Sequence, residues 1–137
     1  MTSNKIHSAI LIIWLTLLSP FSLFSQIKSD KEIPSDCEYV RGILDATLAQ
    51  VADIEDSNVI LIFRLGKGEK SKAVINRRME LVRNHINFRK QNPEKFVLAE
   101  GEKTNGLGKV EIYIKGKLTE VLFAKKNVNL GYDCFSR

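Results

Sequence analysis

Histidine and cysteine are both scarce in this chain of 137 residues, which holds two of each. One histidine, His7, lies close to the N-terminus, so His85 is the only histidine in the rest of the chain. A metal site needs a cluster of His, Cys or acidic ligands, and His85 with two distant cysteines does not form one. We therefore expect neither a bound metal nor another cofactor.

Long apolar runs are limited to one, near the N-terminus. The run AILIIWLTLL at 9–18 follows a short segment whose one charged side chain is Lys5, and Ser19-Pro20 ends it. It is shorter than the roughly 20 apolar residues that span a bilayer, and small residues precede position 26. This pattern is typical of a secretory signal peptide at 1–25, so we expect export to the periplasm or full secretion. A retained anchor is the alternative, and it would provide the only membrane contact that we expect.

The two cysteines, Cys37 and Cys134, lie near opposite ends of the chain that remains after cleavage. In an oxidising compartment such a pair is expected to form a disulfide. Closing a loop of this length contributes about 4–5 kcal/mol in the chain-entropy model. Two reactive thiols are the alternative, although neither cysteine stands in a C-x-x-C motif.

The sequence also lacks the motifs of common nucleophilic enzymes. No G-x-S-x-G motif is present, so the turn that exposes the serine of α/β-hydrolases is missing. A cysteine nucleophile would need a free thiol, which the expected disulfide removes. The remaining candidates for catalysis are the acids Glu100, Glu102 and Glu111. A pair of carboxylates from this set would make the chain a small carboxylate-dependent hydrolase, which is the alternative to a non-catalytic domain.

Charge is distributed unevenly along a chain whose net charge is +5. Residues 38–56 contain five acids and one Arg, whereas residues 64–95 contain ten bases and three acids. The second segment either attracts an anionic partner or forms a solvated basic face beside an acidic helix. Aromatic residues, on which the bases of a nucleic acid could stack, do not alternate with these Lys and Arg residues, so we expect no nucleic-acid partner.

Hydrophobic periodicity predicts one α+β domain at 35–137, preceded by a flexible leader at 26–34. Strand–helix–strand order in the middle indicates a parallel pair of strands, and two helices then pack on a mixed four-stranded sheet. The last two strands form a hairpin through a Gly116-Lys117 turn. The expected elements are a helix capped by Ser35 and ending near Asp53, a strand at 58–64 buried on both faces, a helix at 71–89, and strands at 95–100, 109–115 and 118–124.

The second predicted helix contains a pattern that is found in a known protein family. Arg78, Val82 and Ile86 match the Arg, the Val and the last aliphatic position of L-S-x-x-R-A-x-x-V-x-x-Y-L. Strand segments at 59–64 and 96–101, followed by V-E-I at 110–112, flank the helix in matching order. Over residues 58–115 the chain thus resembles the OmpA-like peptidoglycan-binding domain. The resemblance implies an OmpA-like core and a non-catalytic domain that binds peptidoglycan in the cell envelope.

In that family an Asp in G-x-T-D and the helix Arg grip the diaminopimelate of the stem peptide. This chain has no such Asp, and Glu69 is the nearby carboxylate. A ligand with a carboxylate and an ammonium needs an Arg fork and an acid, and backbone N–H groups at a helix N-terminus assist. We therefore predict a ligand site made by Arg78, Glu69, Gly66 and Gly68. The alternatives are that Arg78 lies along the helix flank while Glu69 caps the turn, and that the partner is an envelope protein.

Overall fold

The computed structural model describes residues 32–52, 54 and 58–131, which belong to one compact unit, Lys31–Arg137. The predicted signal peptide, most of the predicted leader and Cys134 lie outside the described residues. The elements are α2 (Cys37–Ala52), β1 (Val59–Arg64), α3 (Lys72–Phe88), the 3-10 turn η1 (Pro93–Lys95), β2 (Phe96–Glu100), β3 (Gly108–Ile114) and β4 (Lys117–Ala124). Neither of the two described helices has the length and apolar character that a membrane crossing needs.

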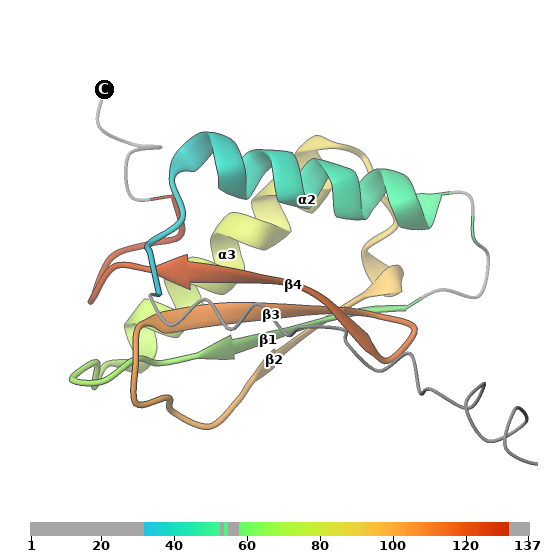
Figure 1. Cartoon of the computed structure of the whole chain (residues 1–137). Helices are drawn as coiled ribbons and strands as arrows, with labels where there is room; N and C mark the ends of the chain where they lie inside the picture. Colours follow the sequence, from blue (N-terminus) through green and yellow to red (C-terminus); the bar gives the residue numbers. More distant parts are fainter. Residues whose placement is uncertain (1–31, 53, 55–57, 132–137) are drawn as a thin grey trace, which may run out of the picture. The chain divides into compact units, whose positions relative to one another are not determined.

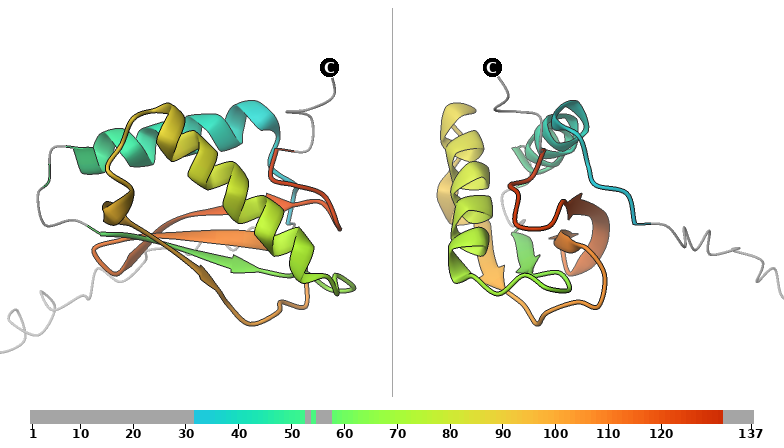
Figure 2. Two further views of the ribbon diagram at one scale, coloured as in Figure 1. Left: turned by 180° about the vertical axis from the view of Figure 1, so that it is seen from behind. Right: turned by 90° about the vertical axis from the view of Figure 1, so that its left-hand side faces the viewer.

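The four strands form one mixed sheet in the order β2-β1-β3-β4. β1 pairs in parallel with β2, so that Val59 lies opposite Phe96, and β1 pairs antiparallel with β3. β3 and β4 form an antiparallel hairpin. Both helices lie over the same face of the sheet (Figures 1 and 2). The predicted α+β fold, with α3 connecting two parallel strands, is confirmed.

The core lies between the helices and the inner face of the sheet. Burial along β1 alternates: Val59, Leu61 and Phe63 are buried, whereas Ile60 and Ile62 are only half-buried. The prediction that this strand is buried on both faces is wrong, because the described helices cover one face only. The helices contribute apolar residues at helical spacing: Val40, Leu44, Leu48 and Val51 from α2, and Val74, Ile75, Met79, Val82 and Ile86 from α3.

The cap of α2 is Asp36, one residue after the predicted cap. Asp36 Oδ1 accepts a hydrogen bond of 2.8 Å from the backbone N–H of Tyr39, which is the geometry of an N-cap. Ser35 instead joins the edge of the sheet. Its N–H donates to Phe123 O at 2.8 Å, and its Oγ accepts from Phe123 N at 3.0 Å. The capping-box prediction is wrong because β4 uses the side chain of Ser35.

The turn between β3 and β4 consists of Lys115 and Gly116, one residue earlier than predicted. Both residues have positive φ, 52° and 74°, which is the type I′ geometry that matches the twist of a hairpin. Ile114 and Lys117 pair across the turn. The glycine therefore occupies the second central position of the turn, and Lys117 belongs to β4.

The C-terminal end of α2 is held by Lys95, which the sequence pattern had placed in a strand. Lys95 Nζ donates to the backbone oxygens of Val51, Ala52 and Ile54 at 3.2, 3.4 and 3.0 Å. The last carbonyls of a helix have no partner within the helix and carry partial negative charge. The ammonium group of Lys95 supplies hydrogen-bond donors and a positive charge to these carbonyls, and it thereby links η1 to α2.

Replacing Lys95 with methionine keeps an unbranched apolar chain but removes all three hydrogen bonds. We expect the free energy of unfolding to fall by about 1–2 kcal/mol, the usual contribution of a charged donor at a helix end. Urea denaturation followed by circular dichroism measures the change. The control is Lys103→Met in an exposed loop position, which we expect to change stability by less than about 0.5 kcal/mol. Equal losses in both variants would show that the hydrogen bonds of Lys95 contribute nothing.

Candidate functional site

Glu69 and Arg78 meet beneath the turn that joins β1 to α3. Glu69 lies in the turn, and Arg78 faces it from the second turn of α3. Arg78 Nη1 and Nη2 donate to Glu69 Oε2 and Oε1 at 3.0 and 2.6 Å, which makes a bidentate ion pair. Each side chain is only 1% exposed. The two residues predicted to share a site are therefore brought together, but they bind each other.

The other polar contacts of the pair are with the backbone of two loops. Glu69 accepts hydrogen bonds of 2.7 Å from the N–H groups of Gly66 and Asn127. Arg78 donates to Val128 O from Nε at 3.1 Å and from Nη2 at 2.8 Å. The pair thus joins the turn after β1 to the segment that follows β4. The alternative to a ligand site, in which Glu69 caps its own turn, agrees with the bond from Gly66.

Glu69 is held in its ionised form despite its burial. Burial by itself raises the pKa of this carboxyl group. The hydrogen bonds from Arg78 and from two backbone N–H groups, together with the charge of Arg78, outweigh that effect and leave the pKa below its ordinary value of 4.5. Glu69 therefore carries its negative charge at neutral pH.

Two glycines allow the backbone to pack against the pair. A Cβ on Gly108 would overlap Arg78 Nη1 and would lie 2.5 Å from Glu69 Oε2. A Cβ on Gly66 would overlap the backbone of Gly108. Gly68 has a different role, since its φ of 80° is a conformation that glycine adopts readily. Gly108 was not among the predicted site residues, although its place two residues before the V-E-I motif of the resemblance was a signal for it.

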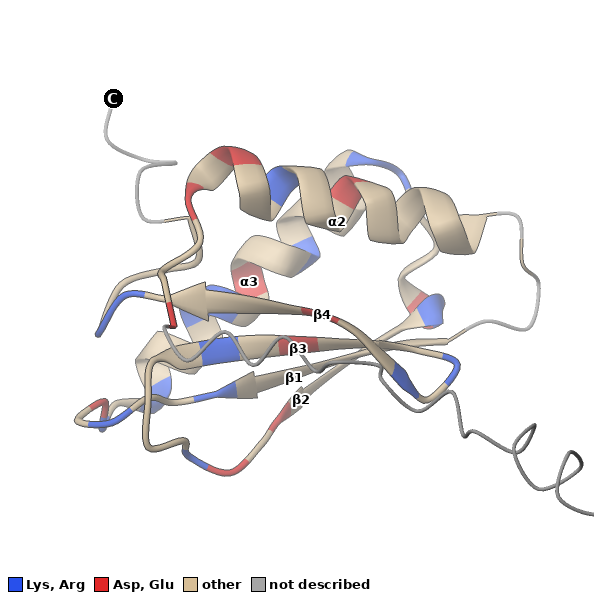
Figure 3. Ribbon diagram, in the orientation of Figure 1, with Lys and Arg blue, Asp and Glu red and all other residues tan. Residues whose placement is uncertain are grey.

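Four exposed lysines, which we call the four-lysine cluster, lie around this end of the sheet. Lys67 and Lys70 are in the turn after β1, and Lys125 and Lys126 follow β4. β1 and β4 run in the same direction, so their C-terminal ends lie at one end of the sheet (Figure 3). The acid of the same turn, Glu69, is buried and neutralised, so the surface of these loops is positively charged.

Of the three acids considered for catalysis, Glu111 and Glu100 form ion pairs, whereas Glu102 contributes only its backbone oxygen, to a hydrogen bond from Arg64. Glu111 Oε2 and Oε1 lie 3.0 Å from Arg64 Nε and Lys109 Nζ, respectively. Burial raises the pKa of Glu111, but the bonds from Lys109 and Arg64 outweigh it and lower the pKa below its ordinary value. Glu100 lies 3.7 Å from Lys72. A general acid for glycoside cleavage needs a raised pKa, so Glu111 is poorly suited to that role.

His85 connects the two helices. Its Nε2 lies 2.7 Å from Asp45 Oδ1 on α2, and Arg89 Nε donates to the same oxygen at 2.8 Å. The hydrogen bond from Arg89 is the main reason that the pKa of Asp45 is lowered, with a smaller contribution from His85. The side chain of His85 is 13% exposed, as expected of a residue that packs on the shoulder of its helix.

Cys37 is the first residue of α2, and its expected disulfide partner, Cys134, lies outside the described residues. The disulfide therefore stays a prediction. Across the part of the chain that the structure describes, no group of three or more His, Cys, Asp or Glu side chains could hold a metal ion.

Three carboxyl groups with lowered pKa values, those of Asp45, Glu69 and Glu111, connect stability to pH. When the pKa of a carboxyl group is lower in the folded than in the unfolded state, the group stabilises the fold at pH values above its unfolded pKa. That stabilisation is lost as the pH falls through the folded pKa. We expect the melting temperature to decrease as pH falls below about 4.5, the ordinary value of the two Glu residues. Thermal denaturation between about pH 7 and pH 2 tests this, and a melting temperature that does not change would contradict it.

These features define a small α+β domain in which a buried ion pair joins two basic loops at one end of a mixed sheet. Comparison with known protein families, with curated proteins and with solved structures finds no match. The resemblance to the OmpA-like domain accordingly rests on the sequence pattern around Arg78.

Proposed function

We propose that this protein is an exported, non-catalytic cell-envelope domain that binds peptidoglycan at the end of the sheet that carries the four-lysine cluster, which we call the loop end. The observation that carries the proposal is the four-lysine cluster, presented by two loops that the buried Glu69–Arg78 pair joins. Stem peptides carry carboxylates, so the polymer has the opposite charge to these loops. The OmpA-like pattern around Arg78 supports the same ligand.

In this proposal Glu69, Arg78, Gly66 and Gly68 position the loops. A buried ion pair adds little net stability, because the cost of desolvation offsets the attraction, and fixing one specific arrangement is its best-attested use. Direct contact between a stem peptide and Arg78 would require the ligand to displace Glu69 from a site where both side chains are 1% exposed. The lysines around it are already accessible.

Co-sedimentation of the full chain with insoluble peptidoglycan tests the proposal. We expect the wild-type protein to pellet, and the Lys67→Glu/Lys126→Glu double variant to bind roughly tenfold more weakly. The control is Lys115→Glu/Lys117→Glu, which makes the same change of charge at the opposite end of the sheet. A wild-type protein that stays in solution, or equal losses in the two variants, would contradict the proposal.

A protein partner in the envelope is the second candidate, and the sheet favours it. The outer face of the sheet has no described helix over it, and the edge strands carry Val97 and Leu118, which are 48% and 46% exposed. Apolar side chains at a sheet edge are a common basis for association. Co-purification of a partner that resists high salt supports this candidate, whereas release at modest ionic strength would indicate attraction by charge alone.

A further inference from the structure

A groove of about 390 Å³ lies between α2 and α3. Its volume falls at the lower end of the roughly 300–1,000 Å³ that is typical of small-molecule sites. The apolar lining residues are Val40, Leu44, Leu81 and Phe88, and the polar ones are Arg41, Asn84, His85 and Arg89. The groove is separate from the four-lysine cluster, and its lining suits a ligand with an apolar body and a polar head.

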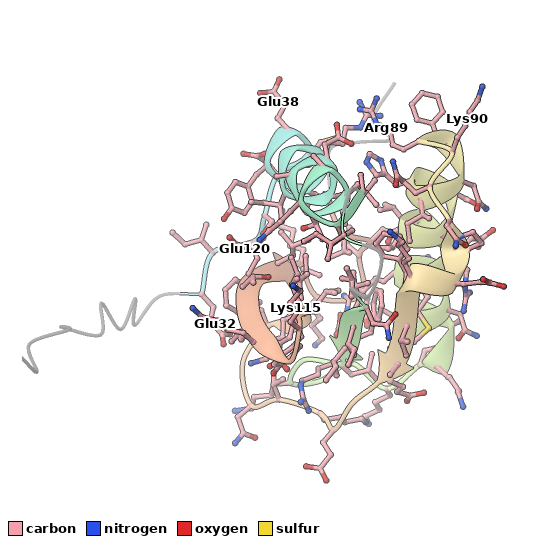
Figure 4. All side chains as sticks on the ribbon, turned by 90° about the vertical axis from the view of Figure 1, so that its right-hand side faces the viewer. Glu32, Glu38, Arg89, Lys90, Lys115 and Glu120 are labelled. Atoms are coloured by element: carbon pink, nitrogen blue, oxygen red, sulfur yellow. The ribbon has the colours of Figure 1, made fainter. Side chains whose placement is uncertain are left out.

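The polar part of the lining is cationic. Arg41 and Arg89 contribute guanidinium groups, and within the described residues no carboxylate lines the groove. Asp45 on α2 pairs with Arg89 through both of its carboxylate oxygens and also lies against His85, so its charge balances that of Arg89. Among the described residues no carboxylate pairs with Arg41, which is therefore the cation that the groove offers to a ligand. Figure 4 shows Arg89 extending from the end of α3 towards α2. The guanidinium group of Arg41 favours a planar carboxylate as the head of the ligand.

Phe88 supplies an apolar surface at the rim of the groove. Its ring is 75% exposed, more than any other large apolar side chain in the described part of the chain. The guanidinium group of Arg89 lies 5.4 Å from the centre of this ring. An apolar body placed against Phe88 and Leu44 would remove exposed apolar surface from water while its carboxylate stays close to Arg41.

We propose that the α2–α3 groove binds a small amphipathic carboxylate. The carboxylate binds the guanidinium group of Arg41, and the apolar body packs against Val40, Leu44 and Phe88. This site does not depend on peptidoglycan binding at the loop end.

Titration of the isotope-labelled full chain with sodium octanoate, followed by amide chemical shifts, tests the proposal. We expect saturation at one octanoate per chain, with shifts concentrated in the residues that line the groove. Arg41→Gln should weaken binding of octanoate about tenfold without changing the weaker binding of octanol, which lacks the charge. The matched control is Arg83→Gln, an exposed α3 position outside the groove lining, which should bind octanoate as the wild type does.

A second variant, Leu81→Trp, fills the groove from its wall and should abolish binding of octanoate and octanol. Its circular dichroism spectrum and its sedimentation with peptidoglycan should stay those of the wild type, which separates the two proposed sites. The proposal is overturned if octanoate causes no saturable shifts, if the shifts lie outside the groove, or if Arg83→Gln weakens binding as much as Arg41→Gln. Binding of octanoate by folded Leu81→Trp with wild-type affinity would also overturn it.

Discussion

The Glu69→Ala variant is expected to lose about 3–5 kcal/mol of its free energy of unfolding. The substitution leaves the guanidinium group of Arg78 buried without its counter-charge, and it removes the acceptor for the N–H groups of Gly66 and Asn127. Domains of this size have total stabilities on the order of 5–15 kcal/mol, so the variant should be close to unfolding. Urea denaturation at about pH 7 measures the loss.

The double variant Glu69→Leu/Arg78→Met separates the charge of the pair from its volume. No unpaired charge stays buried, although the N–H groups of Gly66 and Asn127 still lose their acceptor, so we expect the double variant to lose less than Glu69→Ala does, about 2 kcal/mol. Glu80→Ala, at an exposed position of α3, is the surface control and should change stability by less than about 0.5 kcal/mol. A Glu69→Ala loss as small as that of Glu80→Ala would show that the pair is not a buried ion pair in solution.

Gly108→Ala is expected to destabilise the domain by about 3 kcal/mol, at the upper end of the range for overpacking. The added Cβ would overlap Arg78 Nη1 and lie 2.5 Å from Glu69 Oε2, so the bidentate pair or the start of β3 would have to move. Both members of the pair are also bound to backbone groups of other segments, which limits how far either can shift. Chemical denaturation measures the loss.

The matched control for Gly108→Ala is Gly42→Ala. Gly42 is exposed in the middle of α2, and a Cβ there would have no heavy atom within 4 Å. Because alanine favours a helix by up to about 1 kcal/mol over glycine, this variant should be more stable than the wild type. If both substitutions changed stability in the same direction, the close approach of Gly108 to the ion pair would be contradicted.

The sequence predicted most of the fold because local patterns are strong in this chain. Helical spacing of apolar residues located both helices, and the run of β-branched residues before the Gly66 turn located β1. Two of the errors occurred where a distant segment competes for a local group. Ser35 is bound by β4 instead of capping α2, and Lys95 is drawn out of the predicted strand by the carbonyls at the end of α2.

The candidate site was predicted only in part, for a related reason. The OmpA-like pattern at Arg78, together with Glu69 as the nearby carboxylate, predicted that these two residues share a site, and the structure brings them together. Their burial could not be predicted, because it depends on backbone groups of residues 125–128, which follow the last strand and have no distinctive side-chain pattern. The gathering of four lysines at one end of the sheet could not be predicted either, because it follows from the strand order.

Chemical-shift mapping of the labelled full chain with soluble peptidoglycan fragments tests the central claim, that the loop end of the sheet holds the ligand. We expect the perturbed amides to fall in residues 66–70 and 125–128, with perturbations that weaken as salt is added. The claim would be contradicted by perturbations confined to the Lys115–Gly116 turn or to the α2–α3 groove. It would also be contradicted if the protein sediments with intact peptidoglycan but the fragments perturb no amide.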